Sequence, residues 1–290
     1  MNQIIEQMLK QYDSQNIYDK KNVIKEVVQE IVLSGLSRAN FFKKAAFYGG
    51  TALRIFYALE RFSEDLDFSL KECDPSFEFS EYLPILEKEI RAYGLNFNTK
   101  VIEKTVESGI KSAFLKGSTK EHIMLFYPDE KLANNIGSNE LIKVKFEVDT
   151  NPPNEATFET KYRLLPIPYE ITLYDMPSLF AGKIHAVICR AWKNRVKGRD
   201  LYDYVFYLSR DTAFNLMHLS ARLVQTGYIL NGEQIAIDDV KEMLFKRFAE
   251  INFVQAKQDV LPFIKNVSEL DIWNEEFFCG ITEKLKETKT

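Results

Sequence analysis

Cysteine is scarce in this chain of 290 residues, and its cysteines are poorly placed for structural roles. Cys73, Cys189 and Cys279 are far apart and odd in number, so they form neither a disulfide framework nor a zinc site. The chain also lacks a run of about 18 apolar residues, the length of a membrane-spanning helix, and it lacks a basic, apolar leader at its N-terminus. These absences predict a soluble protein of the reducing cytoplasm, with no membrane partner.

Histidine and excess positive charge are also lacking. His122, His185 and His218 show no metal-ligand spacing, so we expect structural roles, with His185 as the one that could reach a nucleotide. No serine or cysteine lies in a motif for nucleophilic catalysis. The net charge of -4 and the pI near 5.6 argue against a protein that coats nucleic acid through an overall basic surface. Any polyanion must therefore meet a local basic patch.

What the chain does have is enough apolar residues, 46% of the total, to form a packed core. Apolar spacing predicts helices in the first forty residues, at 51–59 and 80–93, and throughout 177–286. Alternating or short apolar patterns predict strands near 45–48, 65–70, 97–103, 111–115, 121–126, 141–149 and 156–162. We therefore predict an α+β fold, with a mixed or antiparallel sheet in a first domain, 1–170, and an all-helical second domain, 171–290.

The first candidate for chemistry is a pair of aspartates on one predicted strand. Asp65 and Asp67 are two residues apart, so both carboxylates point to the same face, with their Cα atoms about 6.5 Å apart. Two such oxygen donors can share Mg²⁺, and a second ion is plausible because phosphoryl-transfer sites often hold two. A two-ion site would need a third carboxylate.

The strand at 141–149 is the best source of that carboxylate. Lys143, Lys145, Glu147 and Asp149 share one face of it, and we favour Glu147 over Asp149. From spacing alone, a solvated edge with mixed charges is the stronger alternative.

Gly49–Thr51 has the features of a phosphate-binding turn. Gly49 and Gly50 let backbone amides approach phosphate oxygens, and the N-terminus of the following helix favours negative charge. Thr51 would cap that helix or contact phosphate. A Gly-Gly pair alone is more often only a turn, but an Asp-x-Asp strand at this distance makes the phosphate role the better interpretation.

Five stretches together resemble a known family. Tyr48–Leu53, Arg61–Phe68, Glu147–Pro153, Leu179–Ala186 and Lys197–Asp203 are similar, in this order, to motifs of the AbiEii/AbiGii-type toxins, a branch of the DNA polymerase β-like nucleotidyltransferases. The match covers roughly residues 45–210. Gly50 and Asp65 lie further apart than in the general polymerase β-like pattern, which suits this toxin branch, and no motif is found beyond residue 210.

The resemblance implies a Mg²⁺-dependent nucleotidyltransferase toxin of a toxin–antitoxin, or abortive infection, pair used in phage defence. It implies a polymerase β-like domain followed by a helical domain that contributes lysine and aspartate motifs and substrate contacts. The substrate would be a nucleoside triphosphate, and related toxins add nucleotides to the 3′ end of tRNA. A cognate antitoxin is an implied partner.

Residue roles follow from the same resemblance. By this analogy Asp65 and Asp67 bind metal, and Glu147 completes the metal site or acts as a base. Lys183 would contact the triphosphate, and Asp200 would be a further catalytic acid. Ser63 matches a nucleotide-binding position, although a serine that caps a turn is an equally good account.

The segment around Lys183 carries the strongest local positive charge of the sequence. Lys183 and Arg190 are seven residues apart and so share a helical face, and four more cations follow: Lys193, Arg195, Lys197 and Arg199. They would neutralise a triphosphate or hold an RNA backbone, unless they only form a solvated helix end.

We expect structural roles for the acidic and aromatic residues that follow. Asp200 is placed to pair with Lys183 or Arg199, and for Asp203 a structural role is favoured. The nearby Trp192, Tyr202, Tyr204 and Tyr207 are expected to be core rather than base-stacking residues.

Two alternatives remain open from the sequence. The first keeps the fold and changes the acceptor to a protein side chain or a small molecule such as an aminoglycoside. The second is a non-catalytic member that acts by binding a partner through its helical half.

Overall fold

The computed structural model describes residues 2–14, 16–102, 109–127, 130–190 and 196–289. Contacts divide the chain into two compact units. Unit 1 comprises Met1–Ala52, Ser63–Pro152 and Thr160–Leu173, and unit 2 comprises Leu53–Phe62, Pro153–Glu159 and Tyr174–Thr290. Four residues of the sequence predictions lie outside the described residues: Glu103, Trp192, Lys193 and Arg195.

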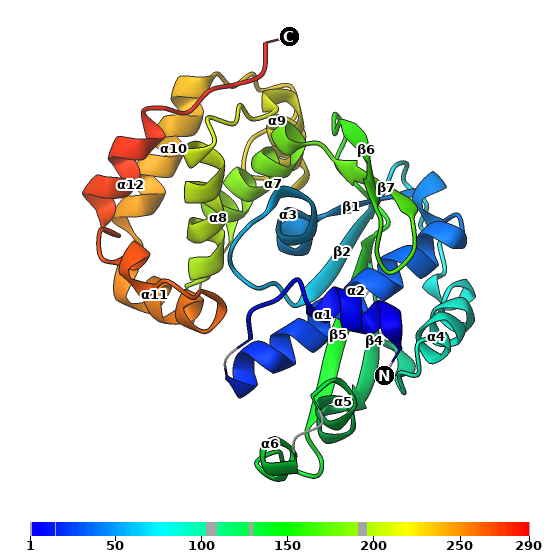
Figure 1. Cartoon of the computed structure of the whole chain (residues 1–290). Helices are drawn as coiled ribbons and strands as arrows, with labels where there is room; N and C mark the ends of the chain where they lie inside the picture. The colour runs from blue at the N-terminus through cyan, green and yellow to red at the C-terminus, as the bar shows by residue number, and fades with distance from the viewer. Residues whose placement is uncertain (1, 15, 103–108, 128–129, 191–195, 290) are drawn as a thin grey trace. The chain divides into compact units, whose positions relative to one another are not determined.

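A seven-stranded sheet forms the centre of unit 1, in the order β3-β4-β5-β2-β1-β7-β6 (Figure 1). Its strands are β1 Ala45–Tyr48, β2 Asp65–Leu70, β3 Asn98–Ile102, β4 Ile110–Ser118, β5 Leu141–Asp149, β6 Phe158–Arg163 and β7 Tyr169–Tyr174. The pairs β1·β2, β3·β4 and β4·β5 are antiparallel, whereas β2·β5 and β1·β7 are parallel. The predicted mixed sheet is therefore confirmed.

The order of these strands determines which side chains lie close together. In the sheet, β5 lies between β4, its antiparallel partner, and β2. β2 in turn pairs with β1, and the chain passes directly from β1 into α3 (Gly49–Tyr57). Because β2 and β5 are parallel, their side chains stay in step along the shared face. This brings the two acidic strands of the sequence side by side.

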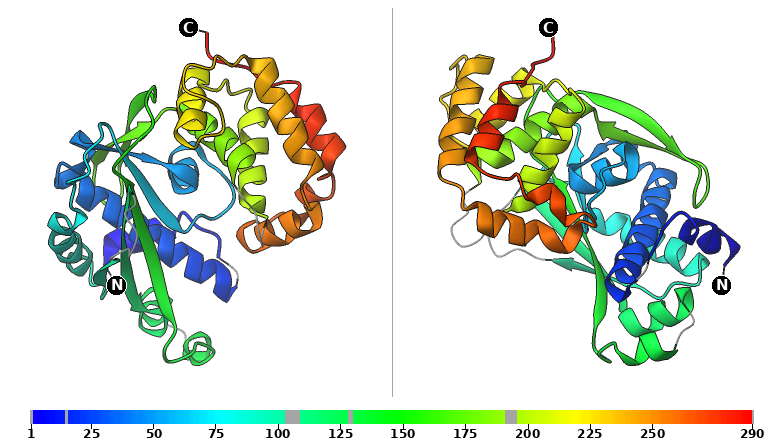
Figure 2. Two further views of the ribbon diagram at one scale, coloured as in Figure 1. Left: turned by 180° about the vertical axis from the view of Figure 1, so that it is seen from behind. Right: turned by 60° about the vertical axis from the view of Figure 1, so that its left-hand side comes forward.

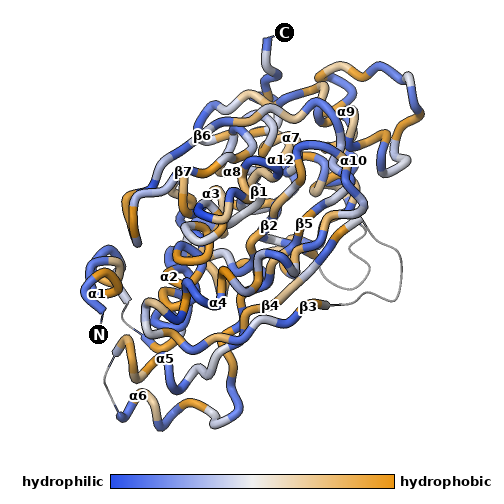
Figure 3. Tube along the Cα trace, turned by 90° about the vertical axis from the view of Figure 1, so that its right-hand side faces the viewer, coloured by the Kyte–Doolittle hydropathy of each residue, from blue (hydrophilic) through white to orange (hydrophobic). Residues whose placement is uncertain are grey.

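The helices of unit 1 follow the apolar patterns of the sequence. They are α1 Gln3–Leu9, α2 Ile17–Arg38, α4 Leu83–Ala92, α5 Thr119–Phe126 and α6 Glu130–Asn134, with 3-10 turns at Phe41–Lys43 and Phe79–Glu81. The predicted apolar stripe of α2 is buried, and its turns alternate between apolar and polar segments in Figure 3. α2 packs against β5, α4 and α5.

One strand prediction in this region is wrong. Residues 121–126 form helix α5 rather than a strand, because Ser118 accepts a hydrogen bond from the Glu121 amide and caps the helix. His122, Ile123 and Phe126 then fall on one buried side. Figure 2 shows α5 and α6 beyond the ends of β4 and β5, where they connect the two strands.

Strand β7 was not predicted. The apolar residues Tyr169, Ile171 and Leu173 alternate with polar ones, which is a strand pattern, and they alternate in burial in the structure. Pro166 and Pro168 just before them instead led to the prediction of a domain boundary. The structure instead pairs β7 with β1, with Leu173 opposite Phe47.

Unit 2 contains the helices that follow β7. They are α7 Met176–Cys189, α8 Gly198–Ser209, α9 Leu216–Gln225, α10 Ile237–Ala249, α11 Phe253–Val260 and α12 Glu275–Thr282, with 3-10 turns at Leu261–Phe263 and Val267–Leu270. α7 contacts α8, α9 and α10, while α8 contacts α11 and α12. The predicted core position is confirmed for Tyr204 and Tyr207, which are buried, and Phe180 stacks on Tyr207. Tyr202 is only half-buried and donates a hydrogen bond to Glu269.

The description of the second half as all-helical is not confirmed. Unit 2 also takes residues 53–62 and 153–159, and Phe214 forms an isolated β-bridge with Glu287. Within the described residues, none of the helices has the length and apolar character that crossing a bilayer requires.

Candidate active site

The predicted aspartate pair lies on β2 with both carboxylates on the half-exposed face. Leu66 and Phe68 alternate with the aspartates and are fully buried, and Phe68 packs edge-on against Phe41. The buried leucine and phenylalanine therefore fix which face Asp65 and Asp67 present.

The neighbouring strand β5 brings an acidic and a basic residue beside that pair. Its parallel register puts Glu147 opposite Asp67 and Lys145 opposite Asp65. Asp149 instead lies opposite Ser69, and its Oδ1 accepts a hydrogen bond from the Asn151 amide at 3.0 Å. The register thus favours Glu147 over Asp149 as the third carboxylate.

Lys145 lies among these acids. Its Nζ is 2.8 Å from Glu147 Oε1, and Ser112 on β4 donates to the same oxygen at 3.2 Å. Burial alone would lower the pKa of Lys145, but the bond to Glu147 and the charges of Asp65 and Asp67 raise the pKa above its ordinary value. The acids of this face therefore stabilise the positive charge of Lys145.

Gly49 allows the Asp67 carboxylate to lie against the start of α3. The φ of Gly49 is +84°, in the left-handed region, and a Cβ there would be 2.6 Å from Asp67 Oδ2. Any side chain would collide with the carboxylate and strain the backbone. Gly50 follows in the first turn of α3.

Thr51 makes a different contact from the two that the sequence suggests. Its side chain is fully buried, and its hydroxyl donates to the carbonyl oxygen of Asp65 at 2.5 Å. Thr51 therefore ties α3 to the first residue of β2.

Ser63 lies in the segment that leads into β2. The buried Gln29 of α2 donates to the carbonyl oxygens of Ser63 and Glu64 at 3.2 and 2.9 Å, and Lys25 forms an ion pair with Glu64 at 2.8 Å. The backbone of this segment is thus held by α2. These contacts leave the choice between the two predicted roles of Ser63 open.

The acidic face suits a divalent cation in its chemistry. Carboxylate oxygens are the donors that Mg²⁺ prefers, and a cationic side chain already lies against Glu147. Among the described residues, however, no three His, Cys, Asp or Glu side chains are already grouped as a metal site. Glu147 is turned toward Lys145, so binding of a metal ion by all three acids requires that its side chain move.

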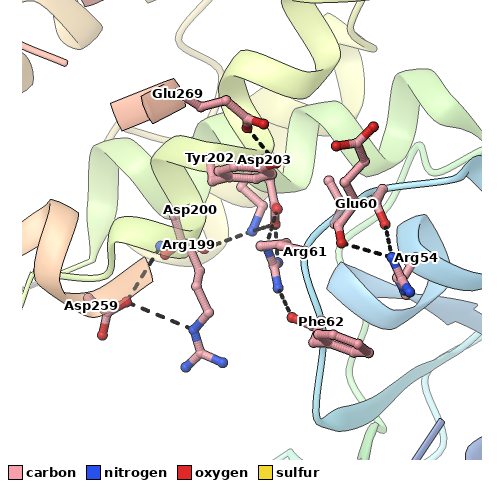
Figure 4. Close-up of polar contacts among 12 residues, drawn as sticks. Arg54, Glu60, Arg61, Phe62, Arg199, Asp200, Tyr202, Asp203, Asp259 and Glu269 are labelled. Atoms are coloured by element: carbon pink, nitrogen blue, oxygen red, sulfur yellow. Dashed lines mark hydrogen bonds and ion pairs between the residues drawn. The ribbon is translucent and has the colours of Figure 1, made fainter. Parts of the chain in front are cut away.

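Lys183 and Asp200, the other two predicted catalytic residues, meet in unit 2. Lys183 Nζ is 2.7 Å from Asp200 Oδ1 and 2.8 Å from Asp203 Oδ2, so it bridges two acids of α8. Arg190 Nη1 contacts Asp200 Oδ2 at 2.5 Å. The predicted pairing of Asp200 with Lys183 is confirmed, whereas Arg199 approaches Asp259 at 3.9 Å (Figure 4).

Arg61 completes this ion-pair network. Its guanidinium donates two hydrogen bonds to Asp203, at 2.6 and 2.7 Å, and a third to the carbonyl oxygen of Phe62 (Figure 4). Arg61 is 3% exposed and Asp203 is fully buried. Sequence reasoning assigned Arg61 no role, because a pair 142 residues apart has no spacing signal; its place in the Arg61–Phe68 motif was the one indication.

The cations of the network favour the ionised form of both aspartates. Burial would raise the pKa of Asp200, but Lys183 and Arg190 lower it below the ordinary value. Arg61 and Lys183 do the same for the pKa of Asp203. In this network Asp200 and Asp203 each contact two cationic side chains.

The three histidines are buried or half-buried in the fold. Burial and the nearby Arg222 lower the pKa of His185 to about 3 and that of His218 to about 4. His185 Nε2 lies 3.1 Å from Thr226 Oγ1, and His122 Nδ1 lies 2.6 Å from the carbonyl oxygen of Ser118.

Taken together, the mixed sheet, the Asp-x-Asp strand beside a third acid and the glycine turn define the nucleotidyltransferase class of fold and site. Residues 31–273 match the family model described as nucleotidyl transferase AbiEii toxin of type IV toxin–antitoxin systems. The chain belongs to this family and is a nucleotidyltransferase.

The solved structures that are similar to this chain include the following two. The crystal structure of JHP933 from Helicobacter pylori is 19% identical, with a TM-score of 0.50, over 92% of this chain and 94% of that one. MenT4, a nucleotidyltransferase toxin from Mycobacterium tuberculosis H37Rv, is 15% identical, with a TM-score of 0.47, over 97% and 94% of the two chains. The former likeness shows the fold alone. No curated protein matches this chain.

Proposed function

We propose that this enzyme transfers a nucleotide from a nucleoside triphosphate to an acceptor hydroxyl at the face formed by Asp65, Asp67 and Glu147, with the 3′ end of a tRNA as the acceptor. The observation that carries the proposal is the parallel register of β2 and β5, which places Glu147 opposite Asp67. A toxin–antitoxin family implies a cognate antitoxin as a partner, and we place the reaction in phage defence.

The reaction is an in-line substitution at phosphorus. The acceptor hydroxyl oxygen forms a bond to the α-phosphorus, the bond from that phosphorus to the bridging oxygen breaks, and pyrophosphate leaves. The hydroxyl proton passes to a carboxylate of the site or to water. Asp65, Asp67 and Glu147 would hold Mg²⁺, as one or two ions, and bound Mg²⁺ would activate the hydroxyl and stabilise the charge on the phosphates.

The residues around the acids position the substrate. Gly49 and Gly50 open the N-terminus of α3, whose backbone amides favour phosphate oxygens. Thr51 fixes that helix to the start of β2 through the Asp65 carbonyl oxygen. We propose that the amides of this turn orient the triphosphate toward the acceptor.

The roles of unit 2 stay predictions. Lys183 is predicted to contact the triphosphate and Asp200 to be a further catalytic acid; the ion pairs support a role of Asp200 in positioning Lys183 and Arg190. Just over half of the Arg190 side chain is exposed, which leaves it accessible to an RNA phosphate. We propose that helices α7 to α12 receive the acceptor.

The test is a labelling experiment. Purified protein and Mg²⁺ are incubated with each of the four α-³²P nucleoside triphosphates and total cellular RNA, and the products are separated on a denaturing gel. We expect label in tRNA-sized bands with one nucleotide, and none with Asp67→Asn or with a chelator present. Label on protein or on a small molecule would refute the RNA acceptor, and toxicity that survives the loss of both Asp65 and Asp67 would refute catalysis as its cause.

A further inference from the structure

Lys145 is a cation built into the acidic face itself. It lies on β5 directly opposite Asp65 and two residues before Glu147, on the same side of the strand. Its Nζ contacts Glu147 Oε1 at 2.8 Å, and 30% of its side chain and 26% of that of Glu147 are exposed. The ammonium group thus lies against the acid that would complete a metal site with Asp65 and Asp67.

The charges of the face explain why an ammonium group is stable there. Three carboxylates on two adjacent strands repel one another, and a single positive charge among them relieves part of that repulsion. Ser112 donates to the same Glu147 oxygen that Lys145 contacts, and so fixes the glutamate in the orientation of the ion pair. A cation bound by Glu147 together with the aspartates would therefore compete with Lys145 for this carboxylate.

We propose that Lys145 is an intramolecular counter-ion of the Asp65, Asp67 and Glu147 carboxylates, and that a divalent cation binds this face only by displacing it. This inference rests on the proposed function, because it concerns the same acids. Lys145 then sets the concentration of Mg²⁺ at which the acids are occupied, and it stabilises the face when no metal ion is bound. It is a positioning residue, acting through Glu147.

The strand offers a matched control. Lys143 is two residues before Lys145, on the same face of β5, but it is exposed. It lies opposite Lys116 of β4 rather than beside the aspartates. Lys143→Met removes the same charge from the same strand without touching the ion pair. Lys145→Arg keeps the charge and should restore the behaviour of the unchanged protein.

The first test is calorimetric titration of the nucleotide-free, chelator-treated protein with MgCl₂. We expect Lys145→Met to bind Mg²⁺ about tenfold more tightly than the unchanged protein, a coupling of ordinary size between two ligands of one site. Lys143→Met and Lys145→Arg should bind as the unchanged protein does. Equal or weaker binding by Lys145→Met would overturn the proposal.

A second measurement needs no variant and so does not depend on folding of Lys145→Met. Lysines of the unchanged protein are acylated with acetic anhydride, with and without Mg²⁺, and quantified by mass spectrometry. We expect Mg²⁺ to increase acylation of Lys145 at least about twofold, because displacement frees its amine, and to leave Lys143 unchanged. Unchanged or decreased acylation of Lys145 while Mg²⁺ binds would overturn the proposal.

The outcomes separate this inference from the proposed function. If the unchanged protein binds Mg²⁺ and labels RNA but Lys145→Met binds no more tightly, the counter-ion role alone fails. If none of the proteins binds Mg²⁺, the metal site fails, and both proposals fail with it.

Discussion

At the scale of single residues, Gly49 is the position at which the site most clearly leaves no room for a side chain. Its φ of +84° is costly for any other residue, and its missing Cβ leaves room for Asp67 Oδ2. We expect Gly49→Ala to lower the transfer rate more than about tenfold and to destabilise the fold by more than backbone strain alone, which costs about 1–2 kcal/mol.

Gly94 provides the control for this prediction. Its φ is +80°, but a Cβ there would meet nothing within 4 Å. Gly94→Ala should therefore show the strain cost alone, with an unchanged transfer rate. Urea unfolding and the labelling assay measure both effects, and equal behaviour of the two variants would contradict the role of Gly49 beside Asp67.

The Arg61–Asp203 pair makes a second prediction at this scale. Arg61→Met leaves the buried Asp203 with Lys183 as its remaining cationic partner, so it should reduce the free energy of unfolding by about 3 kcal/mol, the lower end of the cost of breaking a buried ion pair. The exposed pair Lys286–Asp211 is the matched comparison in the same unit, and Lys286→Met should change stability little. Urea titrations of both variants measure this, and a small effect of Arg61→Met would contradict the buried ion pair.

How far the site could be predicted depended on the kind of signal each residue leaves in the sequence. Asp65, Asp67 and Gly49 were found because a two-residue strand period and a glycine turn are local. The preference for Glu147 was suggested by its strand but needed the β2–β5 register. The contacts of Lys145 could not be predicted, because ion pairing in the fold depends on which strands become neighbours.

At the scale of elements, the strands of the sheet were predictable where alternation was strong and turns were marked. β1 was predicted with its observed bounds, 45–48. The strand prediction for 121–126 was wrong because six residues with four apolar positions fit both periods, and the deciding feature, the Ser118 cap, is a contact rather than a pattern. β7 was missed because two prolines precede it.

Helix α9 carries a prediction about pH. His218 is fully buried in α9, and its Nδ1 donates to the carbonyl oxygen of Asn154 at 2.8 Å. Its pKa falls from 6.5 to about 4, mainly through burial. A lowered pKa of a base means that the unfolded state binds the proton first, so stability is lost as pH falls below about 6.5.

The expected size follows from 1.36 kcal/mol per pKa unit. Between pH 7 and pH 5, His218 should contribute a loss of about 2 kcal/mol in the free energy of unfolding. A His218→Asn variant, compared with the unchanged protein by urea titration at both pH values, should show a loss smaller by that amount. An identical pH dependence in the two proteins would show that His218 does not titrate in this way.

At the scale of the whole molecule, the chain separates its charges between two units. Unit 1 carries the acidic face with its own lysine, and unit 2 carries a network in which Arg61, Lys183 and Arg190 surround Asp200 and Asp203. The sequence indicated both groups, as one strand pair and one basic segment. It did not indicate that residues 53–62 and 153–159 belong with the later helices.

The central claim is that nucleotide transfer takes place at the face shared by β2 and β5. The most direct test is one labelled-nucleotide assay on Asp67→Asn, Glu147→Gln and Asp149→Asn, because the register separates the last residue from the other two. Even the outer-shell partners of metal ligands are worth 10–100-fold, so Asp67→Asn and Glu147→Gln should each slow transfer more than about a hundredfold. Asp149→Asn should change the rate little. Full activity of Glu147→Gln together with loss in Asp149→Asn would contradict the site described here.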